Sequence, residues 1–331
     1  MAMQENQKLK ILYLLKILLE NSDEQNLLSM PQILEYLSTY GINAERKSIY
    51  SDIERLQTFG YDVISQKGGK SGYYIGKRDF ELAELKLLVD SVQSSKFITK
   101  KKSHQLIKKI EGLTSKYYGK ELQRQVYVFD RVKTSNETVY YNVDKLHSAI
   151  TDNKKVAFKY YRYNLEKKHV LRNNGEEYVV SPYSLTFSDD NYYLIAHYPK
   201  NQRLTHFRVD RMVDIRFLDE NSEKITDVTN ENFNLGEYLK KTFDMFGGST
   251  ETVTLLCDNK LINAVIDKFS EDVWISRESE THFKAAAKVN ISPTFYAWVF
   301  TFGGMMKILS PEHVADDFVK HVNEVKEKYG D

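Results

Sequence analysis

Apolar side chains recur at helical spacing in three segments near the start of the chain, at residues 8–20, 29–40 and 43–56. A repeat of about 3.6 residues places such side chains on one face, so the sequence predicts three amphipathic helices. Ser29 is followed three residues later by Gln32. This is the arrangement of a capping box, and it predicts where the second helix begins.

The third predicted helix separates its apolar from its polar residues. At about 100° per residue, Ile49, Ile53 and Leu56 fall on one face, which we expect to be buried. The opposite face can then stay available to a partner. Its polar and charged side chains are Lys47, Ser51, Glu54 and Arg55.

After this helix the pattern changes to two short strand-like runs, residues 63–65 and 73–75, on either side of Gly68 and Gly69. Paired glycines between such runs favour a tight hairpin turn. Three helices followed by a hairpin predict a winged helix-turn-helix, which is a DNA-reading fold, over residues 1–78. A helix with a basic outer face is more often a solvated surface, so the ordered combination of elements carries this prediction.

The outer face of the third helix and the hairpin supply the candidate DNA contacts. Side chains on the helix can reach a groove and its phosphates, and those on the hairpin can act as wing contacts. Asp52 would repel phosphate, so we expect it to orient a neighbouring basic or backbone group. The candidate DNA-binding residues are Arg46, Lys47, Ser48, Tyr50, Ser51, Arg55, Lys67, Lys70 and Tyr73.

From residue 79 to about residue 131, apolar residues again keep helical spacing, which predicts a pair of helices in a linker over residues 79–138. Such a pair commonly holds two DNA-reading heads at a fixed spacing, so we expect a homodimer; a packed linker is the alternative. The stretch from Lys96 to Lys120 is strongly basic. We favour a solvated helical face for it over contact with DNA phosphates.

Short strand-like runs follow a helix predicted at about residues 142–152. Asp189, Asp190 and Asn191 mark a hairpin turn between two of these runs. Many short strands with close turns predict a small barrel. The runs are residues 156–161, 178–187, 192–198, 204–209 and 212–217.

Three of these runs resemble the signature strands of the WYL family. The motifs are Ser-Pro-Tyr-Ser-Leu at residues 181–185, Tyr-Tyr-Leu-Ile-Ala-His at 192–197 and Thr-His-Phe-Arg-Val-Asp-Arg-Met at 205–212. Tyr192 stands where the family usually has tryptophan, and it keeps a large aromatic there. Residues 47–53 resemble the family motif Arg-Thr-Ile-Tyr-Arg-Asp-Ile of its winged helix, with serine where the second arginine is frequent.

The resemblance implies an α+β multidomain protein. Its domains are a winged helix-turn-helix at residues 1–78, a helical linker at 79–138, a WYL domain with a small Sm/SH3-like β-barrel at 139–220, a linker at 221–249 and a C-terminal α/β extension domain of the WCX type at 250–331. The last helix of such a domain would run over residues 312–329, with a buried stripe of Val314, Phe318, Val322 and Val325.

The WYL-like strands carry the candidate ligand contacts. The period of two places His206 and Arg208 on one side of their strand, and Arg211 follows, so these groups could converge on one exposed patch. Arginine forms paired hydrogen bonds to phosphate and tyrosine offers a stacking face, and the resemblance also implies a sensor of anionic ligands. The alternative is an ion pair, for instance Arg211 with Asp210 or Asp214. The candidate ligand-binding residues are Ser181, Tyr183, Tyr193, His206, Arg208 and Arg211.

Composition narrows the classes of protein. The chain has 331 residues, enough for two or three domains, and its formal net charge of +1 argues against indiscriminate coating of nucleic acid. Cys257 is the only cysteine, which excludes an intramolecular disulfide and favours a cytoplasmic location. The apolar stretch at residues 11–19 is far shorter than the ~20 residues of a membrane span, so we expect no membrane partner.

These patterns together predict a ligand-responsive transcription regulator. It would bind a double-stranded DNA operator as a homodimer, and a nucleotide or single-stranded nucleic acid at the barrel would change its affinity for DNA. One alternative is an accessory protein that binds RNA or single-stranded DNA through the barrel. Another is an enzyme acting on nucleic acid, but the eight histidines have no familiar ligand spacing and no nucleophile elbow is present. We therefore expect no catalytic residue, no metal site and no cofactor.

Overall fold

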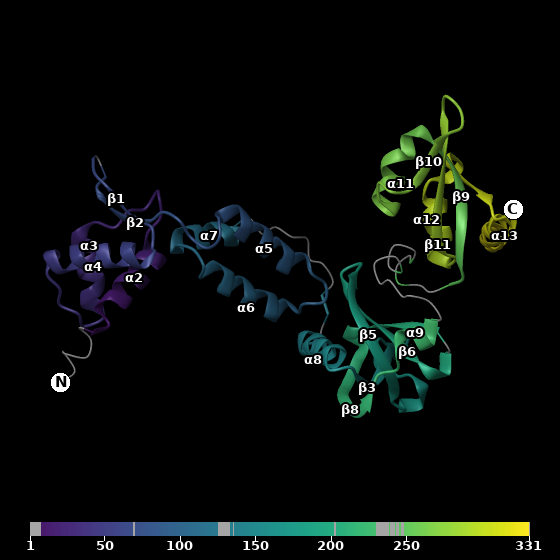
Figure 1. The fold of residues 1–331 in the computed structure, drawn as a ribbon, viewed down its shortest axis with the longest axis horizontal. Coiled ribbons are helices and arrows are strands. Elements are labelled where there is room, and N and C mark those ends of the chain that lie inside the picture. Colours follow the sequence, from purple (N-terminus) through teal and green to yellow (C-terminus); the bar gives the residue numbers. More distant parts are fainter. Residues whose placement is uncertain are drawn as a thin grey trace. The chain divides into compact units, whose positions relative to one another are not determined.

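The structure is a computed structural model that describes residues 8–68, 70–124, 133–134, 136–201, 203–229, 238, 242, 245 and 248–330. The chain forms two compact units, residues 1–137 and residues 138–331 (Figure 1). The predicted contacts of the first unit and those of the second are therefore positioned by separate cores.

Three helices and a hairpin begin the first unit. The helices are α2 (Lys10–Asn21), α3 (Met30–Thr39) and α4 (Arg46–Phe59), and strands β1 (Val63–Gln66) and β2 (Gly72–Ile75) pair antiparallel. These elements share one apolar core, to which α4 contributes its predicted face of Ile49, Ile53 and Leu56. The predicted capping box is confirmed, because the backbone N–H of Ser29 donates to Oε1 of Gln32 at 2.9 Å.

Three further helices follow where the sequence predicted two. They are α5 (Leu82–Ser94), α6 (Lys100–Glu111) and α7 (Lys116–Arg124), around a small core of Leu85, Val89 and Leu122. The side chain of Thr99 accepts a hydrogen bond from the backbone of Lys102 and so starts α6. Local capping divides the segment, and hydrophobic spacing alone did not reveal it. Residues 125–132, the end of the predicted helical stretch, lie outside the described residues.

A buried polar contact joins these helices to the first three. The hydroxyl of Ser115 donates to Oδ2 of Asp23 at 2.5 Å, and both residues are buried. The same carboxylate group holds its own loop through Oδ1, which accepts from the backbone N–H of Asn26 at 2.9 Å. The carboxylate of Asp23 therefore fixes how helices α5 to α7 follow residues 1–78, the N-terminal helices and hairpin, which we call the head.

Replacing Ser115 by alanine should lower the free energy of unfolding of the first unit by about 1–3 kcal/mol, because a buried carboxylate loses a hydrogen bond. Urea denaturation measures this difference. The control is Ser91→Ala, which removes an exposed hydroxyl that donates only to the carbonyl of Leu87 within its own helix. Equal stability of the two variants would contradict a structural role for the Ser115 contact.

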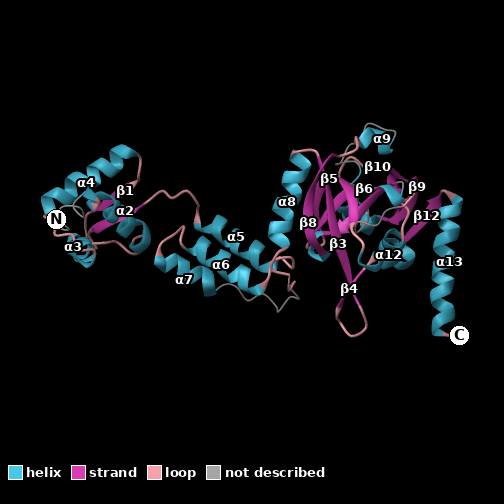
Figure 2. Cartoon of the chain, turned by 90° about the horizontal axis from the view of Figure 1, so that it is seen from below, coloured by secondary structure: helices cyan, strands magenta, loops and turns pink. Residues whose placement is uncertain are grey.

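The second unit opens with helix α8 (Val139–Thr151), which packs against a curled antiparallel sheet. The strands of this sheet are β3 (Lys154–Tyr163), β4 (His169–Leu171), β5 (Tyr178–Ser188), β6 (Asn191–Tyr198), β7 (Arg203–Arg208) and β8 (Met212–Asn221). The sequence predicted five of them and missed β4, a short strand whose three residues are all exposed. Figure 2 shows the β3–β4 hairpin extending beyond the sheet.

The strands pair in the order β4-β3-β5-β6-β7, and β8 pairs with β3. No pairing joins β7 to β8 among the described residues, so the structure has a curled sheet where the sequence predicted a barrel. The predicted turn at Asp189 and Asp190 is confirmed, since both residues have positive φ angles, of 47° and 62°. Aspartate tolerates this left-handed region better than most side chains, which explains its use between β5 and β6.

The C-terminal part of the second unit is a four-stranded antiparallel sheet with helices. After the short helix α9 (Ile225–Thr229), its elements are β9 (Thr250–Asp258), α11 (Ile262–Phe269), β10 (Trp274–Arg277), β11 (His282–Asn290), α12 (Pro293–Thr301), β12 (Met306–Ser310) and α13 (Glu312–Tyr329). The strand order is β10-β11-β9-β12. The sole cysteine, Cys257, lies in its core, where burial raises the pKa of the thiol to about 11.

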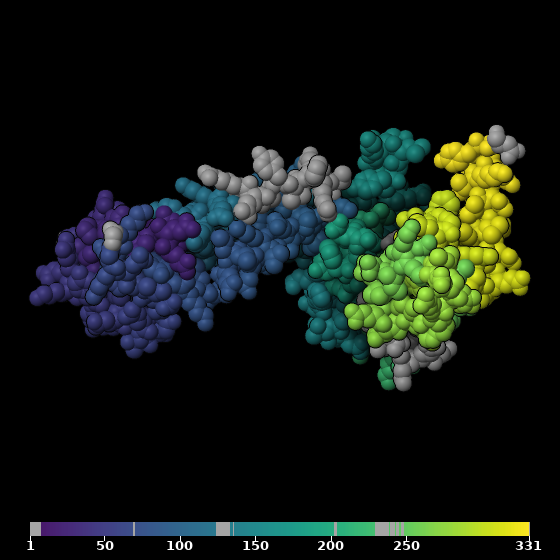
Figure 3. All heavy atoms as spheres, turned by 90° about the horizontal axis from the view of Figure 1, so that it is seen from above, coloured from purple at the N-terminus to yellow at the C-terminus, as the bar shows by residue number. Residues whose placement is uncertain are grey.

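Helix α13 has the predicted bounds but a shorter buried stripe than predicted. Val314 is buried and Phe318 packs against the core, whereas the side chain of Val325 is 54% exposed. The prediction for Val325 was wrong because the second half of the helix projects past the sheet, as Figure 2 shows; the yellow atoms of this end lie at the surface in Figure 3. Apolar spacing along a helix does not tell where the surface it covers ends.

Candidate functional site

The outer face of α4 is open to solvent, as the sequence predicted. Lys47, Ser51 and Arg55 are exposed, and Tyr50 is 45% exposed although it is aromatic. Arg46 is exposed at the first turn of the same helix. This face therefore offers cations, a hydroxyl and a ring to an external partner, while its opposite side is held in the core.

Two polar residues of α4 face the adjoining helix α2. Lys10 on α2 donates from Nζ to the hydroxyl of Ser48 at 2.7 Å, and the same Nζ lies 2.8 Å from Oδ2 of Asp52. Asp52 thus orients a neighbouring basic group, as expected, and it is buried. Ser48, predicted to contact DNA, is half-buried and already bonded to Lys10.

The hairpin presents its two lysines differently from its tyrosine. Lys67 and Lys70 are exposed near the turn. Tyr73 is half-buried, packs against the core of the head, and exchanges backbone hydrogen bonds with Leu28 at 2.8 and 2.9 Å. The lysines are free to reach a partner, whereas the ring of Tyr73 also stabilises the hairpin against the helices.

The predicted ligand-binding residues lie along one face of the WYL-like sheet. On β6, Leu194, Ala196 and Tyr198 point into the core, so alternation turns Tyr193 and His197 to the other face. Tyr193 is opposite Arg208 on β7, and His197 is opposite Ser181 on β5. Four residues of strand separate these two positions, or about 13 Å. The residues form a row along the face, where the sequence had suggested a single patch.

Arg208 is committed to an internal carboxylate. Its Nε and one terminal nitrogen donate to the two oxygens of Asp210 at 3.0 and 2.9 Å, and that nitrogen also donates to Oδ1 of Asn191 at 2.7 Å. The whole Arg208 side chain is 29% exposed. The ion pair with Asp210 that the sequence suggested for Arg211 is therefore formed by Arg208, three positions earlier.

Arg211 has no hydrogen bond or ion pair with any residue that the structure describes. It is half-buried at the same end of the sheet as Tyr193. Burial raises the pKa of Tyr193, and the positive charges of Arg208 and Arg211 act against this shift. Of the predicted cations on this face, Arg211 is the one best placed to bind an external anion beside an aromatic ring.

His206 is covered by residues that follow the sheet in sequence. One ring nitrogen, Nδ1, lies 2.5 Å from the carbonyl oxygen of Met245, and the other, Nε2, lies 2.7 Å from the hydroxyl of Tyr238. Burial lowers the pKa of the imidazole below its usual range. Both nitrogens are occupied, so a ligand reaches this side chain only by displacing a partner.

The lowered pKa of His206 predicts a loss of stability in mild acid. The unfolded chain takes up a proton near the ordinary histidine pKa, about 6.5, whereas the folded chain resists protonation until a lower pH. Stability should therefore be complete above about pH 7 and should fall as the pH drops through this window. Thermal melting at pH 7.5 and 5.5 measures this, and His206→Gln should show a smaller difference between the two pH values. An equal difference in wild type and variant would contradict the prediction.

Ser181 and Tyr183 lie at the other end of the row. The hydroxyl of Ser181 is buried and accepts a hydrogen bond from the backbone N–H of Glu223 at 3.0 Å. Tyr183 occupies the irregular position of β5 between the paired residues Pro182 and Ser184. Burial raises the pKa of Tyr183 to about 12, and nearby carboxylates, Glu223 first, add to the shift.

The sequence did not single out two further polar residues at this end, Lys155 and His197. Nδ1 of His197 lies 2.7 Å from Oε2 of Glu223, and Nζ of Lys155 lies 3.4 Å from Oε1 of the same carboxylate. Alternation from Tyr193 would have placed His197 on this face. Lys155 had no such signal, because its strand pairing was unknown.

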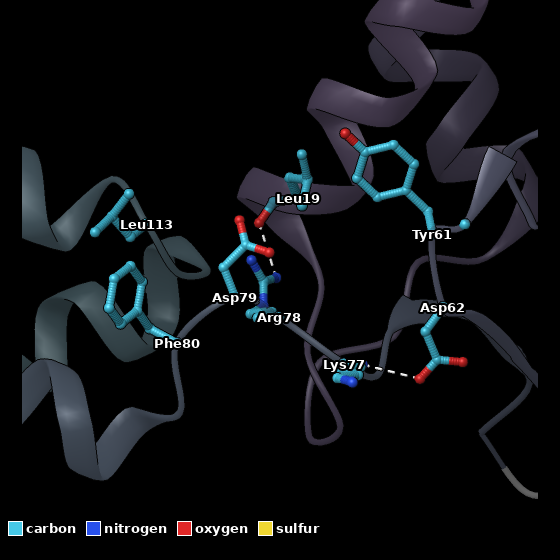
Figure 4. Close-up of a pocket in the computed structure, with 9 residues that line it drawn as sticks. Leu19, Tyr61, Asp62, Lys77, Arg78, Asp79, Phe80 and Leu113 are labelled. Atoms are coloured by element: carbon cyan, nitrogen blue, oxygen red, sulfur yellow. Dashed lines mark hydrogen bonds between the residues drawn. The ribbon is translucent and has the colours of Figure 1, made fainter.

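A separate pocket of about 470 Å³ lies in the first unit, where the chain leaves the head for α5 (Figure 4). Its main cation is already used: one terminal nitrogen of Arg78 donates to the carbonyl oxygens of Leu19 at 2.9 Å and Ser22 at 2.8 Å, at the end of α2. Figure 4 also shows Lys77 bonded through its backbone to Asp62. Arg78 therefore closes a helix end here, and the pocket is poorly suited to an anion.

Two further observations concern metal sites and membrane-spanning helices. Within the described ranges, no three His, Cys, Asp or Glu side chains lie close enough together to hold a metal ion. None of the helices in the described parts of the chain has the length and apolar character needed to cross a membrane.

A comparison with known protein families found a match in the middle of the chain. Residues 141–217 match the family model of the WYL domain. The chain therefore contains a WYL domain, as its three strand motifs predicted. Among curated proteins, none matches the sequence.

Two solved structures are similar to the chain. Proteasome accessory factor B/C (PafBC) of Arthrobacter aurescens aligns over 97% of this chain and 49% of its own length, at 16% identity and a TM-score of 0.29. A structure described as a CRISPR Cas-related protein aligns over 99% of this chain and 85% of its own length, at 14% identity and a TM-score of 0.37. The chain spans about half the length of PafBC. These scores are too low to carry an argument about function.

Proposed function

We propose that the chain is a ligand-responsive, DNA-binding transcription regulator. Residues 1–78 act as a winged helix-turn-helix that reads a double-stranded operator, and the WYL domain senses a nucleic-acid-type or other anionic ligand. The observation that carries this proposal is the exposed basic and aromatic face of α4 in a chain that also contains a WYL domain.

The arrangement of the head supports DNA reading. An α-helix fits the major groove, and Lys47, Tyr50 and Ser51 lie on the free side of α4, where they can meet base edges and phosphates. The exposed lysines of the hairpin, Lys67 and Lys70, are suited to the neighbouring backbone. Asp52, which phosphate would repel, is turned inward to Lys10. The cations that face outward are therefore available to DNA, and Glu54 is the exposed acidic residue on this face.

The polar face of the WYL sheet supports the proposal that the ligand is a short anion. Arg211 has no hydrogen bond or ion pair with a described residue, and its charge acts on Tyr193; a guanidinium group that binds phosphate and a ring that stacks a base suit such a ligand. The row of about 13 Å can accommodate a nucleotide or a few residues of a single strand. We infer that such a ligand binds two states of the regulator unequally, which is the condition for any effect on DNA.

We also infer that the regulator acts as a homodimer. Reading two half-sites requires two heads held about one DNA turn apart, and the helices α5 to α7 lie next to the head in the chain. Sedimentation equilibrium of the purified chain measures its mass. A monomer at the concentration that binds DNA would contradict the inference.

A gel-shift experiment tests the function directly. The purified chain should retard a labelled duplex taken from upstream of its own coding region, and should leave an unrelated duplex of equal length free at the same salt concentration. Ligand extracted from the purified chain and identified by mass spectrometry should change the midpoint when added back. Binding to single strands or RNA with no operator complex would instead favour the accessory-protein alternative.

A further inference from the structure

A row of polar side chains crosses three neighbouring strands at one end of the WYL sheet. Ser181 on β5 is paired with His197 on β6, and the register Val156 to Val180 between β3 and β5, continued by one residue, sets Lys155 opposite Ser181. Adjacent strands lie about 4.8 Å apart, so an ammonium group, a hydroxyl and an imidazole can meet one small ligand group. This is the donor set that proteins use for phosphate or carboxylate.

A carboxylate of the chain itself occupies this row. Glu223 follows β8 directly, and its oxygens lie 2.7 Å from Nδ1 of His197 and 3.4 Å from Nζ of Lys155. Its backbone N–H donates to Ser181 at 3.0 Å. Lys155 also contacts Glu220 at 3.2 Å, but that carboxylate is 69% exposed and can turn to water. The side chains of His197 and Lys155 are only 12% and 18% exposed, and each has an oxygen of Glu223 within 3.4 Å.

With Glu223 in this row, two buried hydroxyl groups of nearby residues remain without a hydrogen bond to any residue that the structure describes. The hydroxyl oxygens of Tyr183 and Ser222 are buried, and neither has a hydrogen-bond partner among the described residues. A buried hydroxyl without a partner is destabilising, because it has lost its hydrogen bonds to water. Tyr183 follows Ser181 by two residues on β5, and its burial, with a smaller contribution from the charge of Glu223, raises its pKa to about 12. A group with more acceptor oxygens than a carboxylate, such as a phosphate, could satisfy a donor that Glu223 does not.

We propose that Lys155, Ser181, His197 and the hydroxyl of Tyr183 form an anion site for a phosphate group of the ligand, and that Glu223 occupies it as an internal competitor. This inference rests on the proposed sensing function and adds a second binding point, separate from Arg211. The incoming phosphate displaces the carboxylate of Glu223, which belongs to the segment leading from the WYL sheet to α9. Binding is thereby coupled to the start of the connection with the C-terminal domain.

The test uses the full chain and a trithymidylate carrying a dye at its 3′ end, with or without a 5′-phosphate. Fluorescence anisotropy at fixed salt measures the dissociation constant. In Glu223→Gln the competing charge is gone, so the phosphorylated probe should bind about tenfold tighter, equivalent to about 1.4 kcal/mol. Lys155→Ala should bind it about tenfold more weakly, since one charged donor is lost. The probe without the phosphate should respond less to either change.

Glu166→Gln is the matched control. It makes the same change of charge in the β3–β4 connection of the same domain and should leave both probes unaffected. If Glu223→Gln binds the phosphorylated probe no better than wild type does, the internal competitor is excluded. Should that variant fold poorly by thermal melting, Lys155→Ala decides, and wild-type affinity in it overturns the site.

The outcomes separate this inference from the proposed sensor. A wild-type chain that binds the probes through Arg211, with Glu223→Gln and Lys155→Ala both unchanged, keeps the sensor and rejects the second anion site. A chain that binds neither probe in any variant rejects both. Inorganic phosphate that competes with the phosphorylated probe in wild type, but not in Lys155→Ala, would support the row as the point of contact.

Discussion

Replacing Lys47 and Tyr50 together by alanine is expected to abolish the discrete complex with operator DNA while the head remains folded. Both side chains are exposed on α4, so neither contributes to the apolar core formed by Ile49, Ile53 and Leu56. Loss of a phosphate contact and a groove contact should weaken binding by at least about 30-fold, given about 1–3 kcal/mol for each good base contact. A gel shift with the upstream duplex measures the midpoint.

The salt dependence of DNA affinity distinguishes the loss of a specific phosphate contact from a general loss of positive charge. Removing the Lys47 contact should reduce the slope of log affinity against log salt by about one unit. Lys16→Ala on α2 is the control, because it removes the same charge from an exposed side chain outside the predicted reading face. A double variant that keeps wild-type affinity, or a Lys16→Ala variant that loses as much, would move DNA binding to another surface.

The head was the part of the fold best predicted from the sequence, for a physical reason. Its signals are local: a capping box at Ser29, the helical spacing of Ile49 and Ile53, and a glycine-rich turn. Each specifies an element without knowledge of the rest of the chain. The linker helices were predicted less well, since the division at Thr99 depends on a cap that hydrophobic spacing does not report.

The candidate sites show what a sequence pattern leaves open. Alternation correctly placed His206 and Arg208 on one side of their strand, but it could not tell which arginine was free, because Asp210 lies within two residues of both Arg208 and Arg211. Turn geometry after β7 directs Asp210 to Arg208. Lys155 and Glu223 were missed because their meeting depends on strand order and on the path after β8, which are long-range properties.

Arg208 and Arg211 of the WYL domain should therefore behave in opposite ways. Arg208→Ala removes a paired contact to Asp210 and a bond to Asn191, and should lower the free energy of unfolding of the second unit by about 1–3 kcal/mol. Arg211→Ala breaks no hydrogen bond or ion pair with a described residue, so its change should stay within about 0.5 kcal/mol. Urea denaturation of the two variants measures the difference.

The two variants should show the opposite order in their effects on ligand affinity. Because its guanidinium group is uncommitted, Arg211→Ala should weaken binding of the labelled trithymidylate by about 10- to 100-fold, the range of a lost charged contact to phosphate. Arg216→Ala is the control, since Arg216 is exposed and paired with Glu177 on the same sheet. If Arg211→Ala lowers the free energy of unfolding as much as Arg208→Ala does, both arginines have a structural role. If it keeps both stability and affinity, the anionic ligand does not bind at this end of the WYL sheet.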